Sequence, residues 1–273
     1  MGSLDGKVAF ITGAGRGQGR SHAVRMAEEG ANIIAVDVCQ DIPLLPYAMA
    51  SSADLKETVR LVEEAGGKAI GVEADVRDVE AMNAAAKQGF DAFGRIDIII
   101  ANAGIAAQQV EEADPSALFN LTMAINAFGV RNTIQAAVPY TIEGGNGGSV
   151  VITSSTQGLQ GRGGSGSGAG DGYVASKHAV VGLMRSWAHW LAPHMIRVNT
   201  IHPTGVDTYM ITNPAFMDYL KVMAGKSNGL QNLMPVPMVH VEDITNAVMY
   251  LVSDAGQYVT GVTLPIDAGF NVR

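Results

Sequence analysis

A chain of 273 residues, 47% hydrophobic and 16% charged, with a formal net charge of −8, is too apolar for a disordered protein and has the length of one α/β domain. The acidic balance without a basic block argues against nucleic acid or an anionic membrane as a partner, and no apolar run reaches the roughly 18 residues of a membrane span. The single cysteine excludes an internal disulfide, and the lack of a signal-peptide layout predicts a cytoplasmic location.

Short β-rich runs alternate with longer helical patterns along the whole chain. The expected strands are 8–12, 31–37, 68–76, 96–104, 149–155, 196–203 and 263–267. The expected helices are one that ends near residue 29, then 53–66, about 79–93, about 117–140, about 173–191 and 242–253. Continuous apolar strands separated by helices predict an α/β fold, a single-domain Rossmann-type doubly wound parallel sheet with helices on both faces, over residues 1–273.

The turn after the first expected strand reads TGAGRGQG and contains Gly13, Gly17 and Gly19. Glycine permits positive φ and a close approach of backbone to phosphate, and the helix that follows offers free N–H groups to a pyrophosphate. Asp37 ends the second expected strand, where a carboxylate accepts hydrogen bonds from the adenosine ribose and repels a 2′-phosphate. This favours NAD over NADP, although Arg16 is a counter-signal because it could bind that phosphate.

The sequence YVASK places Tyr173 and Lys177 four residues apart, on one face of an expected helix. A nearby ammonium lowers the pKa of a phenol from its usual value near 10, which makes a tyrosine usable as an acid or base. The sequence TSS ends the strand 149–155 at its carboxyl edge, where open α/β sheets bind ligands. A serine hydroxyl there could hold a substrate oxygen beside Tyr173.

These motifs, in this order, resemble the short-chain dehydrogenase/reductase family over essentially the whole chain. The residues that carry the resemblance are TGAGRGQG, ADV at 74–76, NAG at 102–104, AIN at 124–126, TSS, YVASK and HPTGVDT at 202–208. The resemblance implies Tyr173 as the general acid/base and Lys177 as the group that holds the nicotinamide ribose and tunes Tyr173. It implies that Ser155, rather than Ser154, orients the substrate oxygen, and that Asn126 belongs to a water-linked proton relay.

The same resemblance implies NAD as the cofactor and no metal. Where the family commonly has Pro-Gly after the sixth strand, this chain has Pro203 and Thr204, which puts the backbone geometry of that turn in question. The implied cofactor contacts are Gly13, Arg16, Gly17, Gln18, Gly19, Asp37, Val38, Asp75, Val76, Asn102, Ala103, Gly104, Tyr173, Lys177, Pro203, Val206 and Thr208.

Within that family, the long segment after Asp37 and the sequences TSSTQGLQG, YVASKHAVVGLM and VNTIHPTGVDT resemble the carveol-dehydrogenase-like, mycofactocin-associated branch. This resemblance implies NAD that is held too firmly to exchange freely, and an external redox acceptor of the mycofactocin type. The insertion at 38–52 is placed to fold over the adenosine half of the cofactor. The alternative is that it is an ordinary surface loop.

Residues 204–239 carry few strand or helix signals but many apolar side chains, which favours a lid over an apolar substrate pocket. Five methionines lie here, at 210, 217, 223, 234 and 238. If the segment is a lid, the substrate is a small hydrophobic alcohol or ketone, such as a terpenoid. The family ending DAGF implies a homotetramer by resemblance. Core packing is the alternative for each methionine.

Two other functions compete with an NAD-dependent alcohol dehydrogenase. A Rossmann-type epimerase or dehydratase is disfavoured because no sequence typical of a sugar-nucleotide domain follows. A non-catalytic NAD-binding sensor or scaffold is disfavoured because Ser155, Tyr173 and Lys177 are all present. The glycine-rich stretch 161–172 separates Ser155 from Tyr173, so we expect an enlarged loop at the rim of the active site rather than a linker between domains.

Overall fold

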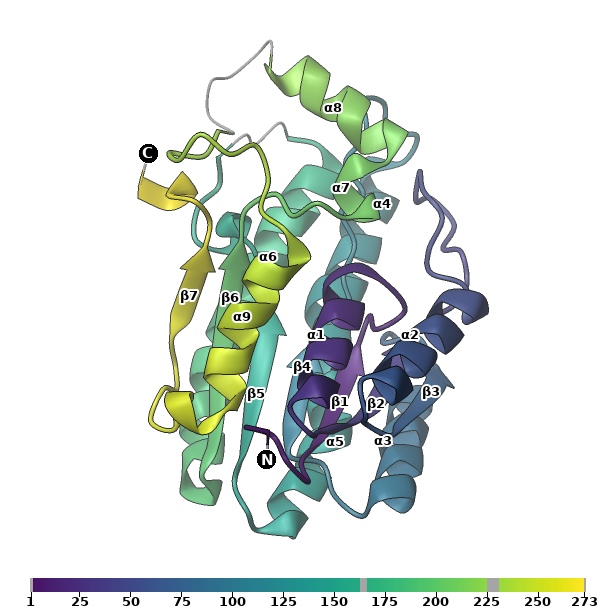
Figure 1. The fold of residues 1–273 in the computed structure, drawn as a ribbon. Helices are drawn as coiled ribbons and strands as arrows, with labels where there is room; N and C mark the ends of the chain where they lie inside the picture. Colours follow the sequence, from purple (N-terminus) through teal and green to yellow (C-terminus); the bar gives the residue numbers. More distant parts are fainter. Residues whose placement is uncertain (1, 163–165, 225–230, 273) are drawn as a thin grey trace.

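The computed structural model describes residues 2–162, 166–224 and 231–272, with the side chains of 223 and 224 left out, and it confirms the predicted fold class (Figure 1). Seven parallel strands form one sheet in the order β3-β2-β1-β4-β5-β6-β7. They are β1 (Val8–Thr12), β2 (Asn32–Asp37), β3 (Ala69–Glu73), β4 (Ile98–Ala101), β5 (Gly148–Thr153), β6 (Ile196–Pro203) and β7 (Thr263–Ile266). The strand order reverses between β1 and β4, and ligands of such sheets bind at the carboxyl ends beside that point.

Helices cover both faces of the sheet, with α1, α2 and α9 on one face and α3 to α6 on the other (Figure 1). α7 and α8 lie beyond the carboxyl ends of the strands. The bounds are α1 (Gly17–Glu28), α2 (Ser52–Glu64), α3 (Val79–Phe93), α4 (Pro115–Met123), α5 (Val130–Gly144), α6 (Gly168–Leu191), α7 (Tyr209–Thr212), α8 (Pro214–Ala224) and α9 (Val241–Val252).

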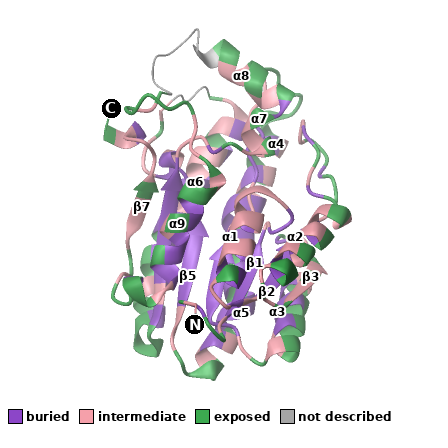
Figure 2. Cartoon of the chain, viewed as in Figure 1, coloured by how far each residue is buried: buried purple, intermediate pink, exposed green. Residues whose placement is uncertain are grey.

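Two hydrophobic cores lie on opposite faces of the sheet, and the central strands are buried throughout (Figure 2). Side chains of a strand alternate between its faces. Phe10 of β1 therefore belongs to the core under α3, α5 and α6, whereas its neighbour Ile11 belongs to the core under α1, α2 and α9. Burial on both faces explains why these strands read as continuous apolar runs. It also leaves the strand ends as the places where polar side chains can gather.

The glycine-rich stretch differs from its prediction as one long loop. Residues 163–165 lie outside the described residues, but Gly168–Gly172 form the start of α6, with Ser167 as the N-cap. The carboxylate of Glu112 accepts hydrogen bonds from the backbone N–H groups of Gly168 and Ala169, at 2.7 and 3.1 Å. A Cβ on Gly168 would lie 1.7 Å from the carbonyl oxygen of Pro115. These glycines thus allow α6 to pack against α4, which loop composition alone does not indicate.

Two other segments also differ from their predicted form. The expected single helix 117–140 is interrupted by a π-helical segment at Ala124–Gly129, which carries Asn126. The region after β6 was expected to lack regular structure, but it forms α7 and α8. Residues 225–230 of this region lie outside the described residues. Over the described ranges, no helix has both the length and the apolar character needed to cross a membrane.

Candidate active site

A cleft of about 420 Å³ lies at the carboxyl ends of the strands, and almost every predicted site residue lines it. Only Gly19 and Asn126 lie behind its wall. The predicted residues that line the cleft are Gly13, Arg16, Gly17, Gln18, Asp37, Val38, Asp75, Val76, Asn102, Ala103, Gly104, Ser155, Tyr173, Lys177, Pro203, Val206 and Thr208.

The turn between β1 and α1 has the backbone form that its glycines predict. Gly13 and Gly17 have φ of +68° and +57°, in the region that side chains disfavour. A Cβ on Gly17 would lie 3.4 Å from the methyl group of Thr208, so the turn faces the segment after β6. Gly19 has a packing role instead, because a Cβ there would lie 2.1 Å from the carbonyl oxygen of Gly13. The turn therefore presents backbone, rather than side chains, to the cleft.

Asp37 fixes this turn from the end of β2. Its Oδ2 accepts a hydrogen bond of 2.8 Å from the backbone N–H of Gly15. Burial raises the pKa of Asp37, while the N–H groups of Gly15, Cys39 and Val38 act in the opposite direction. The carboxylate thus joins the glycine turn to the first residues of the insertion, and it still lines the cleft.

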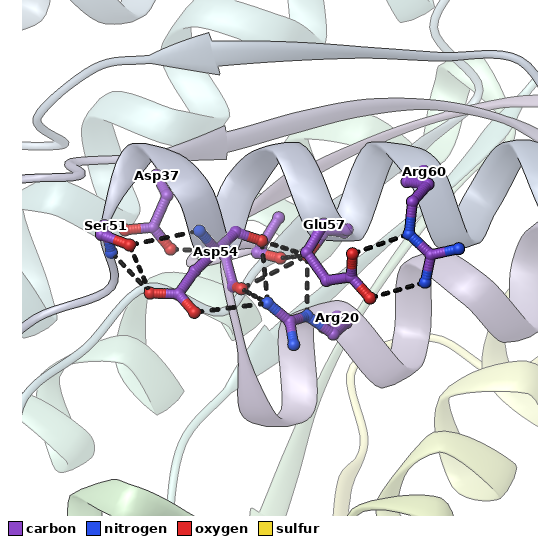
Figure 3. A network of polar contacts seen from close by, with 9 residues as sticks. Arg20, Asp37, Ser51, Asp54, Glu57 and Arg60 are labelled. Carbon is purple, nitrogen blue, oxygen red and sulfur yellow. Dashed lines mark hydrogen bonds and ion pairs between the residues drawn. The ribbon is translucent and has the colours of Figure 1, made fainter.

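Behind the turn, Arg20 joins α1 to the start of α2 (Figure 3). Its guanidinium donates to the carbonyl oxygens of Gly15 and Asp54, at 2.5 and 2.8 Å, and to the hydroxyl of Thr58 at 2.9 Å. Ser51 and Asp54 form a capping box at the first turn of α2, directly after the insertion. The insertion 38–52 is therefore held at one end by Asp37 and at the other by this polar network.

The insertion contacts Arg16, the residue that could otherwise bind the 2′-phosphate of NADP. Its Nη2 donates to the carbonyl oxygen of Ala48 at 2.6 Å, and its guanidinium lies 5.0 Å from the ring centroid of Tyr209. Both contacts turn the cation toward the protein. Arg16 thus joins the glycine turn, the insertion and α7.

Tyr47 extends the insertion across the cleft to the loop after β4. Its hydroxyl accepts a hydrogen bond of 3.2 Å from the backbone N–H of Ala106, and its side chain is buried. Burial raises the pKa of Tyr47 to about 12, with a small contribution from the charge of Tyr173. Ile42, Met49 and Ala50 of the same segment line the cleft as well. The insertion therefore crosses the cleft from the end of β2 to the loop after β4, which is further than the sequence predicts.

The two serines at the end of β5 make different contacts. The Ser154 hydroxyl donates to the backbone carbonyl of Lys177 at 2.9 Å, so it holds α6. The Ser155 hydroxyl lies beside the phenol of Tyr173 and lowers the pKa of that phenol. In this geometry Ser155, rather than Ser154, faces the group that would exchange a proton with a substrate.

Lys177 lies beside Tyr173, with Nζ 5.7 Å from the centroid of the phenol ring. The ammonium donates to the carbonyl oxygen of Thr153 at 2.8 Å and is buried. Burial lowers the pKa of Lys177 to about 8. Burial also raises the pKa of Tyr173, and only the Ser155 hydroxyl opposes it. In the protein chain by itself, burial therefore outweighs any lowering of the Tyr173 pKa by the ammonium.

Two asparagines support the floor of the cleft. Asn102 donates from Nδ2 to the carbonyl of Thr12 at 3.1 Å and accepts from the Thr153 hydroxyl at 3.3 Å, which joins the ends of β1, β4 and β5. Asn126 is fully buried, and its amide exchanges two hydrogen bonds with the backbone of Ile105, at 2.8 and 2.9 Å. A Cβ on Gly104 would lie 3.3 Å from Asn126 Oδ1 and 3.5 Å from Lys177 Nζ, so Asn126 lies near Lys177.

The segment after β6 covers the other end of the cleft. Val206 and Val239 form an isolated parallel bridge that joins the two ends of the predicted lid. Four of the five methionines in that segment have described side chains: Met210 lines the cleft, Met217 and Met234 are exposed, and Met238 is half-buried. The Met223 side chain lies outside the described residues. The apolar wall is formed instead by Tyr209, Met210 and Ile211. In the described part of the chain, no group of His, Cys, Asp and Glu could hold a metal ion.

Comparison with known proteins finds a matching family model and relatives that match nearly the whole chain. A family model described as enoyl-(acyl carrier protein) reductase matches residues 13–271. The (−)-trans-carveol dehydrogenase of Rhodococcus erythropolis is 42% identical over 282 residues, which cover all of both chains. An uncharacterised oxidoreductase of Mycobacterium tuberculosis is 51% identical over 268 residues, or 98% of this chain and 97% of the relative.

Solved structures agree over the full length. A carveol dehydrogenase from Mycobacterium avium in complex with NAD superposes with a TM-score of 0.91 at 42% identity, covering 100% of both chains. A short-chain dehydrogenase from Mycobacterium paratuberculosis bound to NAD gives a TM-score of 0.90, also at 42% identity and 100% of both chains.

Proposed function

The chain belongs to the short-chain dehydrogenase/reductase family and is an NAD-dependent alcohol dehydrogenase, and on this premise we propose that it interconverts a hydrophobic secondary alcohol, such as a terpenoid, and its ketone. The observation that carries the proposal is the meeting of Ser155, Tyr173 and Lys177 in one cleft with the glycine turn and Asp37. A relative named as a carveol dehydrogenase supports the class of substrate.

The residues present fit a dinucleotide. The amide oxygen of Gln18 is buried at the start of α1 and has no partner among the described residues. Gly13 and Gly17 have no side chains, so the backbone of the same turn is accessible to a ligand. The turn and the α1 N-terminus would hold the pyrophosphate, Asp37 the adenosine ribose, and Lys177 the nicotinamide ribose. When bound, NAD supplies the carbon that accepts or returns the hydride.

In the oxidation direction, the Oη atom of Tyr173 takes the hydroxyl proton of the alcohol. The Ser155 hydroxyl, which lies beside Tyr173, orients the substrate oxygen toward it. A cation at Lys177 favours the phenolate of Tyr173 and so opposes the effect of burial. Asn126 belongs to a water-linked relay that carries the proton onward, and its position near Lys177 supports this role. In the reverse direction Tyr173 donates the proton.

The substrate end of the cleft supports an apolar ligand. Beyond Tyr173 the wall consists of Ile105, Tyr209, Met210 and Ile211, which offer few hydrogen-bonding groups to a ligand. Apolar pockets of this kind, with a small number of placed polar groups, fit hydrophobic molecules. The segment 204–239 then acts as the lid over the substrate.

We also propose that NAD stays bound between turnovers, so that an external redox acceptor of the mycofactocin type reoxidises it in place. The support is the path of the insertion, which contacts the protein on both sides of the cleft through Arg16 and Ala106. The resemblance further implies a homotetramer in the cytoplasm. The exposed aromatic residues Phe119, Phe128 and Trp190 are compatible with subunit contacts, and light scattering of the purified protein measures the assembly.

A panel of hydrophobic secondary alcohols, assayed with added NAD and with an artificial electron acceptor, tests the function. Tyr173→Phe should lose at least about 100-fold in turnover, as expected for removal of a general acid/base, and should keep its NAD. Unchanged oxidation in that variant would overturn the assignment and favour a non-catalytic NAD-binding protein. Turnover with the acceptor alone, by protein that carries NAD(H) after purification, supports retained cofactor. Rapid exchange of added NAD contradicts it.

A further inference from the structure

His202, near the end of β6, lies directly behind the catalytic serine. Its side chain is completely buried and does not line the cleft. Nδ1 lies 2.7 Å from the carbonyl oxygen of Ser155, and Nε2 lies 2.8 Å from the hydroxyl of Thr200. Both imidazole nitrogens are therefore occupied, and one of them holds the backbone of Ser155.

The hydrogen-bond ladder between β5 and β6 ends one residue before that carbonyl. The last backbone bond between β5 and β6 runs from Ser154 N–H to the Ile201 carbonyl at 2.9 Å. In a parallel ladder the next donor on β6 would be residue 203, and Pro203 has no N–H. Past this point the strands can no longer fix the backbone of β5. The imidazole of His202 provides the hydrogen bond one residue further along, at Ser155.

The partners of His202 determine its tautomer. A carbonyl oxygen can only accept, so Nδ1 must carry the proton that it donates to Ser155. In the neutral imidazole Nε2 then accepts from the Thr200 hydroxyl, whose other acceptor, the Val262 carbonyl, is farther away at 3.4 Å. Burial lowers the pKa of His202 to about 4, which keeps the ring neutral at physiological pH. Thr200 thus selects the form of His202 that can hold Ser155.

We propose that His202 is a positioning residue, which holds the Ser155 carbonyl so that the Ser155 hydroxyl faces the phenol of Tyr173. The inference rests on the proposed function, since it assigns His202 to the same reaction without contact with the substrate. The Ser155 hydroxyl also accepts from the Gln157 N–H at 3.1 Å, so its direction follows from the backbone on both sides of Ser155. A shift of that backbone would move the Ser155 hydroxyl relative to the phenol of Tyr173 and so weaken its effect on the pKa of Tyr173.

The charged and titratable groups near His202 and Tyr173 come from three parts of the chain. Lys177 and His178 of α6 and Asp267, after β7, act on His202. Lys177 also lies beside the Tyr173 ring, and Tyr47, in the insertion, interacts electrostatically with Tyr173. None of them is changed by a substitution at 202 or 200. A change in the acidity of Tyr173 in such variants therefore reports the Ser155 contact.

The decisive measurement is the pKa of Tyr173 in the holoprotein, from the NMR shift of 13Cζ-labelled tyrosine. The chain has seven tyrosines, and Tyr173→Phe identifies the signal. His202→Asn keeps a donor near the Nδ1 position, whereas His202→Leu has a similar shape and no donor. Thr200→Val removes the hydroxyl that selects the tautomer but keeps the imidazole. Thermal unfolding and NAD content are recorded for all variants.

The leucine variant should raise the pKa of Tyr173 by about one and lower kcat about tenfold, with KM changed much less, as expected for the loss of one hydrogen bond. His202→Asn should restore most of the wild-type Tyr173 pKa and kcat. Thr200→Val should give values between those of the wild type and those of His202→Leu. A leucine variant that is less stable but has the wild-type Tyr173 pKa would reduce His202 to a structural role and overturn the proposal. So would equal effects of asparagine and leucine.

Two further outcomes can be distinguished from a failure of the proposal about His202. If the leucine variant does not fold, Thr200→Val and the asparagine variant still decide, because a wild-type Tyr173 pKa in Thr200→Val contradicts the proposal. If the wild-type protein oxidises no alcohol with any acceptor, the proposed function fails. The NMR titration still decides whether His202 sets the acidity of Tyr173.

Discussion

The ring of Tyr47 meets the ring of Tyr209 edge to face, with centroids 6.4 Å apart and an angle of 81° between the ring planes. Tyr47 belongs to the insertion after β2, and Tyr209 begins α7. Two segments far apart in the sequence therefore join over the cleft, and the Arg16 guanidinium packs against the same Tyr209 ring. Opening the cleft requires that these contacts separate.

Replacing Tyr47 tests whether this contact retains the cofactor. Tyr47→Ala removes both the ring and the bond to Ala106, so NAD should dissociate at least about tenfold faster, as expected when a contact worth over 1.4 kcal/mol is lost. Tyr47→Phe keeps the ring and should release NAD nearly as slowly as the wild type. The release rate is measured by dilution into an enzyme that consumes free NAD. Tyr258→Ala, at a side chain that is 84% exposed, is the control. Equal release from the wild type and Tyr47→Ala would contradict this role.

Asp37 should decide which dinucleotide is bound. Asp37→Asn keeps an acceptor for the Gly15 N–H but loses the charge, so NAD affinity should fall about 10- to 100-fold. NADP should gain little, because Arg16 already contacts Ala48 and Tyr209. Mass spectrometry of acid extracts gives the ratio of the two cofactors in purified protein. Asp91→Asn, at an exposed ion pair with Lys87, is the control. Strong NADP binding by Asp37→Asn would show that Arg16 is free to bind the phosphate.

Two glycines of α6 provide a matched test of why the glycine-rich stretch is helical. A Cβ on Gly168 would collide with the Pro115 carbonyl, whereas a Cβ on Gly182 meets nothing within 4 Å. Gly168→Ala should therefore cost roughly 1–3 kcal/mol of unfolding free energy through overpacking. Gly182→Ala should stabilise the helix by up to about 1 kcal/mol. Chemical denaturation measures both, and a neutral Gly168→Ala would mean that α4 and α6 separate easily.

The sequence predicts the sheet and most of the cleft because both follow from local signals. Apolar runs give the strands, and the polar residues that follow them, such as Asp37 and Ser155, gather wherever parallel strands end together. Tyr47 is different, because its role depends on how a long insertion folds back, and no periodicity reports that. The only signal in the sequence for this role is that Tyr47 is an aromatic residue in the insertion that follows β2. The tertiary packing that makes Gly168 helical is equally invisible in composition.

The raised pKa of Tyr173 could not be predicted from the sequence for a related reason. Spacing shows that Lys177 shares a helix face with Tyr173, but it does not show how deeply both are buried. In the structure, burial raises the pKa of Tyr173 and lowers that of Lys177 to about 8. The expected effect of the ammonium thus depends on competing desolvation, which only the three-dimensional arrangement reveals.

Two buried histidines should make the fold sensitive to mild acid. Burial lowers the pKa of His22 to about 3 and that of His202 to about 4, against an ordinary value of 6.5. Above pH 6.5 both histidines are neutral in the folded and in the unfolded chain, so neither makes the unfolding free energy depend on pH. As the pH falls from 6.5 toward 4, the unfolded chain takes up two protons that the folded chain does not, so the unfolding free energy falls. The limiting slope is about 2.7 kcal/mol per pH unit for two sites.

His22→Asn isolates one of these contributions. The His22 imidazole contacts the Thr245 hydroxyl at 2.8 Å, and asparagine keeps a polar group at that position without a titratable proton. Between pH 6 and 4.5 its unfolding free energy should decline with about half the wild-type slope. His194→Asn, at an exposed side chain, is the control. Urea denaturation at several pH values measures the three slopes. If the slope of His22→Asn equals that of the wild type, His22 is protonated in the folded protein and its burial does not exclude the charge.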